Sequence, residues 1–289
     1  MSHELQSRAE ALGQSLPPLL AQAEFLAATV MLGEHGRRRS GQGDEFWQYR
    51  AAMPGDSLRL IDWRRSGMSD HHFVREREWQ AAQSVSLWVD AAKSMSFSGD
   101  KSRETKSDRA RLLALALAVL LLRGGERVGL CGADVPPRPG RAQLVKLSAV
   151  LSADASPQDY GAPEVHGMVP HGRAVFFSDF LGDPAAVDQA LIQAADRGVR
   201  GALVMVLDPA EEDFPFAGRT IFESMTGGLR HETQQASDLR QKYLTRLAQR
   251  KDHLTQIAAK TGWQMTVHHT GHPAQTALLW LFQAMQGGR

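Results

Sequence analysis

The sequence predicts an α/β fold with a doubly wound, mainly parallel sheet, preceded by a small N-terminal helical and β-containing segment. From residue 84 onward, short runs of Val, Leu and Phe alternate with longer segments of helical periodicity. The short runs are apolar almost throughout, which is typical of strands that are covered on both faces. Such a sheet carries its functional residues at the carboxyl ends of the strands, near the point where the strand order reverses.

The chain divides into three predicted parts: a helical segment at 1–32, a small β-containing segment at 33–83, and the α/β domain at 84–289. The middle part is rich in Gly, Arg and aromatic residues. We expect β-like pieces there at 46–49 and 58–63, with a Pro-Gly-Asp turn between them.

The α/β domain begins with two strand–helix pairs, with strands expected at 84–90 and 127–133 and helices at 107–125 and 140–153. The first helix has Ser107 or Asp108 as its N-cap and Gly124 as its stop. Its apolar run 112–122 is only about half a membrane span, so it is predicted to be a core helix that is covered on several sides.

The rest of the domain is predicted to continue the alternation. We expect strands at 173–180, 200–208 and 263–269, helices at 184–198, 236–260 and from 273, and a β-like excursion at 218–232. Pro184 begins one of these helices and Gly198 ends it, which is the usual asymmetry of helix termini.

The composition excludes several classes of partner. The chain has 33 Lys and Arg against 32 Asp and Glu, which gives no basic field for nucleic acid or an anionic membrane. Arginines at 37–39 could stack with aromatic residues on single-stranded nucleic acid, but nearby acids match them and we expect ion pairs. No segment reaches about 20 uninterrupted apolar residues, and no signal peptide is evident. We therefore expect a cytoplasmic protein without membrane insertion.

The cysteine, histidine and glycine patterns argue against several kinds of site. The single Cys131 excludes a disulfide framework, and its strand-like surroundings favour an inert buried thiol. His268 and His269 are adjacent on a strand and point to opposite faces, so we expect ordinary surface or hydrogen-bonded histidines rather than zinc ligands. The Gly-Gln-Gly at 41–43 lacks a preceding strand and a Walker lysine, which argues against a nucleotide site. No Ser–His–Asp arrangement or nucleophile elbow can be recognised.

Two predicted strands end in an acid, Asp90 and Asp179. Because parallel strands present their carboxyl ends at one edge, neighbouring strands would bring these carboxylates to one cleft. Carboxylates and hydroxyls suit Mg2+, which prefers about six oxygen ligands. A simpler role for Asp90 is to cap the following turn by accepting hydrogen bonds from backbone N–H groups.

The loop after the first predicted strand resembles the metal-site signature of a known domain family. Asp90-Ala91-Ala92-Lys93-Ser94 is similar to the Asp-x-Ser-x-Ser signature of von Willebrand factor A domains, whose metal-ion-dependent adhesion site adds a Thr and a second Asp. The wider motifs "GQGDEFWQYRAAMPGDSLRLIDWRRSG", "LLRGGERVGL", "FFSDF" and "DLRQKYLTRLAQRKDHLTQIAAKTGWQMTVHHT" resemble the bacterial family called domain of unknown function 58 over about residues 33–285. The resemblance implies a von Willebrand A-like interaction protein that works with a MoxR-type AAA+ ATPase.

The metal site implied by the resemblance is degenerate in this chain. Ala92 stands where the first signature Ser is expected, and no signature Thr follows Cys131. The implied Mg2+ ligands are therefore Asp90, Ser94 and Asp179, with Ser96 or Ser98 as substitutes. Alternatively, the ammonium of Lys93 neutralises the acids and replaces the metal.

The leading hypothesis is a non-enzymatic adaptor that binds its partner ATPase through the edge formed by Asp90, Ser94 and Asp179. Lys93, Ser96 and Asp183 are the predicted partner-binding residues at that edge. The alternative is a Mg2+-dependent hydrolase of phosphate esters that uses the two acids. A weaker third hypothesis is nucleic-acid binding by the arginine-rich N-terminal segment, which would weaken steeply with salt.

Overall fold

The computed structural model describes residues 17–34, 46–53, 61–67, 72–77, 82–153, 156–228 and 230–286. The chain forms two compact units. Residues 34–82 make up the smaller unit, and the larger unit combines the chain before residue 34 with the chain from residue 83 onward. Arg37 to Arg39, the first arginines of the segment in the nucleic-acid hypothesis, lie outside the described residues.

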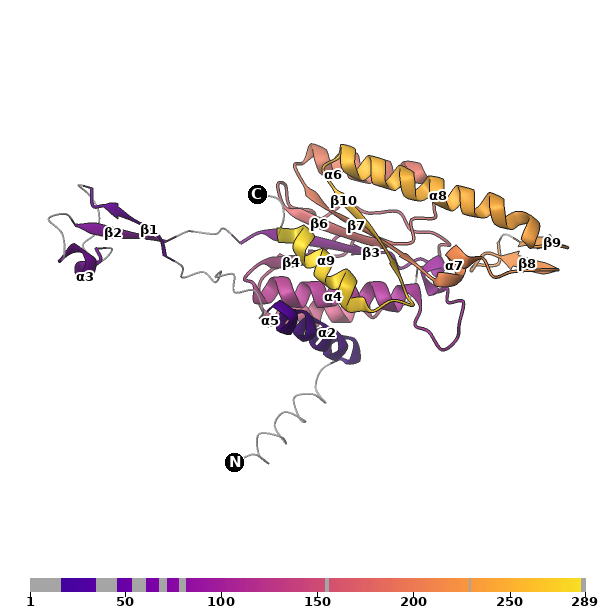
Figure 1. The fold of residues 1–289 in the computed structure, drawn as a ribbon, viewed down its shortest axis with the longest axis horizontal. Coiled ribbons are helices and arrows are strands. Elements are labelled where there is room, and N and C mark those ends of the chain that lie inside the picture. The colour runs from indigo at the N-terminus through magenta and orange to yellow at the C-terminus, as the bar shows by residue number, and fades with distance from the viewer. Residues whose placement is uncertain are drawn as a thin grey trace, which may run out of the picture. The chain divides into compact units, whose positions relative to one another are not determined.

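A mainly parallel sheet forms the centre of the larger unit (Figure 1). Its strands run in the order β10-β7-β6-β3-β4-β5. In chain order they are β3 (Ser84–Val89), β4 (Arg127–Leu130), β5 (Val135–Arg138), β6 (Arg173–Ser178), β7 (Arg200–Leu207) and β10 (Gln264–His269). The strand order reverses between β3 and β6, and all neighbours pair in parallel except β4 and β5. This arrangement confirms the predicted doubly wound α/β fold.

Helices cover both faces of the sheet (Figure 1). One apolar core contains residues of α2 (Pro18–Glu34), α4 (Lys106–Arg123), α5 (Arg141–Leu151) and α9 (Ala274–Gln286). The other contains residues of α6 (Pro184–Asp196) and α8 (Ser237–Lys260). Every residue from Leu113 to Val119 of α4 is fully buried, because α4 packs on the sheet and also contacts α5 and α9. The prediction of a core helix is confirmed.

Helix α4 begins earlier than the sequence indicated. Its N-cap is Thr105, whose hydroxyl oxygen accepts the backbone N–H of Asp108 at 3.1 Å. The prediction of Ser107 or Asp108 as N-cap was therefore wrong. Both belong to the first turn, where Asp108 is favourable because of the positive end of the helix dipole. Strand β5 was not expected, since its sequence contains Pro136 and Pro137. Such residues are tolerated at the edge of a sheet.

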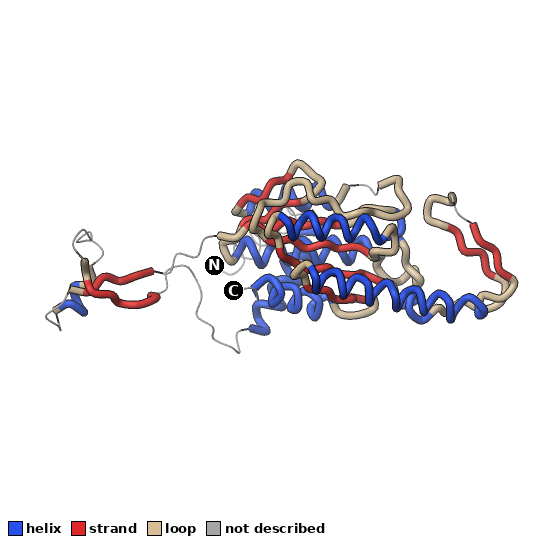
Figure 2. Tube along the Cα trace, turned by 90° about the horizontal axis from the view of Figure 1, so that it is seen from above, coloured by secondary structure: helices blue, strands red, loops and turns tan. Residues whose placement is uncertain are grey.

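A β-hairpin follows the short helix α7 (Pro209–Asp213) and projects beyond the main sheet (Figure 2). Strands β8 (Thr220–Glu223) and β9 (Arg230–Thr233) pair antiparallel, within the predicted excursion. The ring of Phe214 stacks on Phe222 at 5.8 Å and lies 5.1 Å from Tyr243 of α8. An aromatic cluster thus anchors the hairpin to α8.

The smaller unit contains an antiparallel pair, β1 (Phe46–Ala51) and β2 (Phe73–Arg77), and one helical turn, α3 (Trp63–Ser66). The predicted strand at 46–49 is confirmed. The one predicted at 58–63 falls partly outside the described residues, and Trp63 begins α3 instead. The Ser66 hydroxyl links α3 to β2 by accepting the Phe73 N–H at 2.9 Å. None of the helices in the described ranges is long and apolar enough to cross a membrane.

Candidate functional site

The two predicted acids lie at the ends of adjacent strands. Val89 of β3 pairs in register with Phe177 of β6, and Asp90 and Asp179 follow at the same edge of the sheet. The strand order reverses between these two strands, so the acids lie where a doubly wound sheet places its functional residues. Both carboxylates are buried, each residue being 1% exposed.

Asp90 is held by hydrogen bonds from its own loop and from the end of β6. Its Oδ1 accepts the Ala92 N–H at 2.8 Å, and its Oδ2 accepts the Ser178 hydroxyl at 2.6 Å. Gly161 lies so close that a Cβ there would be 2.1 Å from Asp90 Oδ1, so only glycine fits. Burial raises the pKa of Asp90, the hydrogen bonds oppose this, and the charge of Asp179 adds to it. The contact with Ala92 is the turn-capping interaction expected as the simpler role.

Asp179 is paired with a lysine. Lys106 Nζ donates to Asp179 Oδ2 at 2.9 Å and to Glu211 Oε1 at 2.7 Å. The other oxygen of Asp179 accepts the Leu181 N–H at 3.1 Å. Burial lowers the pKa of Lys106, but the two carboxylates outweigh it, so the net shift is upward. The ammonium therefore stays charged inside the protein.

Lys106 is the cation that the sequence prediction missed. Lys93 lies half-buried in the 3-10 turn η2 (Lys93–Ser96), where its backbone N–H donates to Gln158 O at 2.9 Å. No ion pair joins Lys93 to either strand-end acid in the described parts of the chain, and Asp179 pairs with Lys106 instead. One feature of the sequence could have identified Lys106. A lysine in the first turn of a helix is unfavourable with respect to the helix dipole, so it suggests acids nearby.

A second basic residue of the same region binds the next strand end. Asp208 follows β7 and is fully buried, and Arg103 Nη1 lies 3.2 Å from its Oδ2. Asp208 is also the N-cap of α7, where its Oδ1 accepts the Ala210 N–H at 2.8 Å. Glu211 Oε2 accepts the Asp208 N–H at 2.9 Å and completes a capping box. Glu211 thus connects the ends of β6 and β7 through Lys106.

A third basic residue binds the end of β10. Arg109 Nη1 lies 2.7 Å from His268 Nε2, and Arg109 Nη2 donates to Thr270 O at 3.0 Å. Burial and the nearby guanidinium lower the pKa of His268 to about 3, so this histidine is neutral. His268 is therefore a hydrogen-bonded buried histidine, as expected. The start of α4 and the loop before it supply one cation to each of β6, β7 and β10.

The remaining predicted site residues belong to the segments that follow β3 and β6. Ser94 is 8% exposed, and its hydroxyl has no hydrogen-bond partner among the described residues. Ser96 is exposed, and the Ser98 hydroxyl donates to the backbone of its own loop. Asp183 is also exposed and caps α6, where its Oδ1 accepts the Ala185 N–H at 3.0 Å. Of the predicted residues, only Asp90 and Asp179 lie at adjacent buried strand ends.

The donor set does not fit a Mg2+ ion. Each carboxylate oxygen of Asp90 and Asp179 already accepts a hydrogen bond from the protein, and one of these donors is an ammonium. The Ser94 hydroxyl is the predicted ligand that is left without a partner. Within the described ranges, no group of three or more His, Cys, Asp or Glu side chains is placed to hold a metal ion.

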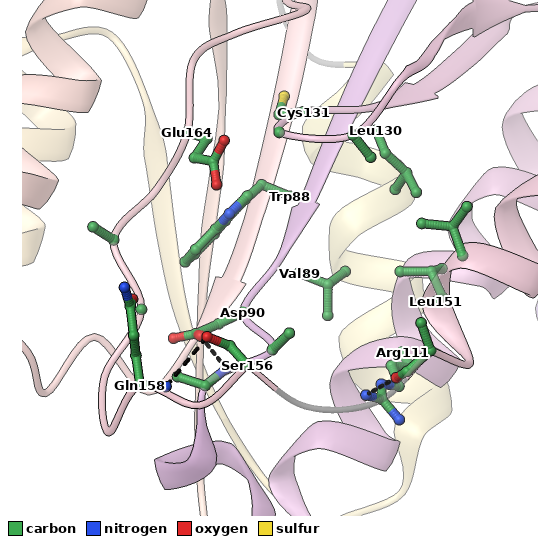
Figure 3. A pocket seen from close by; sticks show the side chains of 18 residues that line it. Trp88, Val89, Asp90, Arg111, Leu130, Cys131, Leu151, Ser156, Gln158 and Glu164 are labelled. Atoms are coloured by element: carbon green, nitrogen blue, oxygen red, sulfur yellow. Dashed lines mark hydrogen bonds between the residues drawn. The ribbon is translucent and has the colours of Figure 1, made fainter.

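A cavity of about 270 Å³ lies beside Asp90, toward β4 and α5. Figure 3 shows Trp88 on one wall, between Asp90 and Glu164, and Leu130 and Leu151 on the opposite wall. Cys131 also lines this cavity, and burial raises the pKa of its thiol to about 12. The prediction of a buried thiol is therefore confirmed, and the raised pKa favours the unreactive thiol form that was also expected.

The fold and the site define a doubly wound α/β protein with buried acids at the strand ends, one of which is paired with a lysine of the same chain. Residues 48–253 match the family described as "Protein of unknown function DUF58". The chain belongs to this family, as its motifs indicated.

The chain is also similar to uncharacterised relatives and, more distantly, to solved structures. "Uncharacterized protein Rv1480" of Mycobacterium tuberculosis is 29% identical over 217 residues, covering 70% of this chain and 67% of the relative. "Uncharacterized protein Mb1516" of Mycobacterium bovis matches with the same figures. A structure of "conserved hypothetical protein BatB" from Bacteroides thetaiotaomicron covers 72% of this chain and all of its own, at 13% identity and a TM-score of 0.41. An "aerotolerance-related membrane protein" from Bacteroides fragilis gives 14% identity and a TM-score of 0.40, with 72% of this chain covered.

Proposed function

We propose that this chain is a non-enzymatic interaction protein with a von Willebrand A-like domain that binds a protein partner at the carboxyl ends of its strands. The family resemblance suggests a MoxR-type AAA+ ATPase as that partner. We call the binding region the edge surface and define it by five residues that surround the buried acids: Lys93, Ser96, Asp159, Tyr160 and Asp183.

One observation supports this proposal above the others: the acids are enclosed, whereas the loops around them offer exposed groups. Asp90 and Asp179 are each 1% exposed and bound on both carboxylate oxygens. Tyr160 is 45% exposed, and Ser96 and Asp183 are also exposed. A hydrolase needs accessible reacting groups, while an interface needs exposed groups on a rigid support.

Hydrogen bonds and close packing join the loops of the edge surface to one another. Asp159 O accepts the Ser94 N–H at 2.9 Å, which joins the loop of Tyr160 to the loop of Lys93. The Asp159 carboxylate accepts the hydroxyl of Thr226, at the tip of the β8–β9 hairpin, at 2.6 Å. Tyr160 lies against Gly182, where an added Cβ would be 2.9 Å from the Tyr160 Cβ. A tyrosine held in this way gives contact area at low entropic cost.

Binding to the purified partner ATPase would test the proposal. We expect Lys93→Glu and Tyr160→Ser to weaken binding by at least about tenfold each, because hot-spot residues at interfaces contribute on this scale. Lys260→Glu is the matched control. It makes the same charge change at an exposed position just before β10, at the opposite end of the strands. Equal affinity of the wild type and all three variants would argue against the edge surface.

A second assay separates the proposal from the hydrolase alternative. Turnover of a phosphate ester that requires Mg2+ and is lost in Asp90→Ala would support the hydrolase. An interaction protein should show no turnover in either form. Association with the ATPase that is unchanged by EDTA is expected, because the cation paired with Asp179 is a lysine.

A further inference from the structure

We infer that the ammonium of Lys106 is the resident cation of the Asp179 and Glu211 carboxylates and occupies the place that a divalent metal ion would need at the end of β6. The inference concerns the edge used in the proposed function, but it does not depend on whether a partner binds there.

The contacts of Lys106 are those of a bound cation. Its Nζ lies 2.9 Å from Asp179 Oδ2 and 2.7 Å from Glu211 Oε1, and its side chain is 1% exposed. The ring of Phe97 is also close, with its centroid 5.7 Å from Nζ, and an aromatic face attracts a cation. A charge is tolerated in a protein interior only when it is paired and hydrogen-bonded. Lys106 meets both conditions.

The place of Lys106 in the chain supports a dedicated role. It is the first residue of α4, directly after the N-cap Thr105. The helix dipole disfavours a positive charge at this end, so lysine is a poor choice there for the helix alone. Asp179 and Glu211 compensate for this cost from outside the helix. The lysine is therefore explained by the acids rather than by the helix.

A metal ion would have to compete with this ammonium. Mg2+ requires about six oxygen ligands in a near-octahedral arrangement. To reach Asp179 it would have to displace Lys106, which would leave a buried ammonium beside a divalent cation. On Asp90 the Ala92 N–H and the Ser178 hydroxyl already use one acceptor position of each oxygen, so this carboxylate alone leaves a metal ion few of the ligands it needs. Removal of the lysine side chain should free Asp179 and Glu211 together.

Titration with Mn2+, followed by the electron paramagnetic resonance signal of the free ion, tests the inference. We expect the wild type to bind no Mn2+ saturably. Lys106→Ala should gain saturable Mn2+ binding, because two buried carboxylates then lack a counter-ion. The control Lys101→Ala removes an exposed lysine of the preceding loop and should behave as the wild type. Adding Asp179→Asn to Lys106→Ala should abolish the gained binding.

Two results would overturn the inference. One is saturable Mn2+ binding by the wild type that Asp90→Asn or Asp179→Asn removes. The other is a folded Lys106→Ala variant that gains no binding. If this variant does not fold, thermal unfolding of the wild type in Mg2+ and in EDTA decides. Equal unfolding temperatures in Mg2+ and in EDTA would support Lys106 as the built-in cation. The inference would be refuted if Mg2+ raised the unfolding temperature of the wild type but not that of Asp179→Asn. None of these readouts involves the ATPase, so failure of the proposed function would leave them interpretable.

Discussion

The ends of β3 and β6 carry the same kind of residue in the same position, yet they use it differently. Asp90, after β3, accepts a hydroxyl and a backbone N–H, and both donors are neutral. Asp179, after β6, is bound by the ammonium of Lys106. The two strands are neighbours and parallel, and both acids are equally buried. Topology therefore brings the acids to one edge, but it does not decide what each acid does.

The difference arises from elements that are distant in sequence. The start of α4 and the loop before it direct Arg103, Lys106 and Arg109 to the ends of β7, β6 and β10. No basic residue of this group reaches the end of β3, so Asp90 depends on hydrogen bonds alone. A charged pair and a hydrogen-bonded carboxylate should respond differently to substitution and to pH.

Substitution of Lys106 should have the largest effect. Lys106→Met keeps most of the volume but leaves the carboxylates of Asp179 and Glu211 buried together without a counter-ion. Breaking a buried ion pair in this way costs about 3–5 kcal/mol of unfolding free energy. Equilibrium urea unfolding followed by helical circular dichroism would measure it. Lys101→Met is the control, and a loss as small as in that exposed control would contradict the pairing.

Asp179→Asn should be the next most destabilising change. It removes one of the two carboxylates of Lys106 and leaves Glu211 in place, so the expected loss is about 2–3 kcal/mol. Asp90→Asn should cost only about 1 kcal/mol, because the lost partner is a neutral hydroxyl. The same urea experiment compares the two variants. Equal losses would mean that the two strand ends do not differ as described.

The sequence predicted the sheet and its functional edge because these depend on local patterns. Apolar runs such as "AVFFS" mark buried strands, and a parallel sheet places the following acids at one edge. The partner of Asp179 could not be identified in this way. Lys106 lies 73 positions from Asp179 in the chain, and Lys93 was closer to the motif. Choosing between the two lysines required the position at which α4 begins, and helix boundaries are the least certain part of such a prediction.

The pH dependence of stability offers a finer comparison. Burial raises the pKa of Asp90 above its ordinary value of 3.8, so the folded protein holds this proton more tightly than the unfolded chain does. The stabilisation from this group is therefore greatest below pH 3.8 and decreases as the pH rises through the folded-state pKa. Asp90→Asn cannot titrate, so it removes this contribution to the pH dependence of the unfolding free energy. The loss caused by the substitution should be larger in acid than at neutral pH, as urea unfolding over a pH series would show. A loss that does not change with pH would contradict a raised pKa.

The smallest effect is expected for Lys93, and it separates stability from binding. Lys93 is half-buried and forms no ion pair with Asp90 or Asp179 in the part of the chain that the structure describes. Lys93→Ala should therefore change the unfolding free energy by no more than about 0.5 kcal/mol, as for most surface substitutions. Thermal or urea unfolding beside Lys106→Met would provide the contrast between the two lysines. A loss for Lys93→Ala near that of Lys106→Met would mean that Lys93 helps to neutralise the acids. A small loss combined with weaker ATPase binding would place Lys93 on the interaction surface and Lys106 in the structure that supports it.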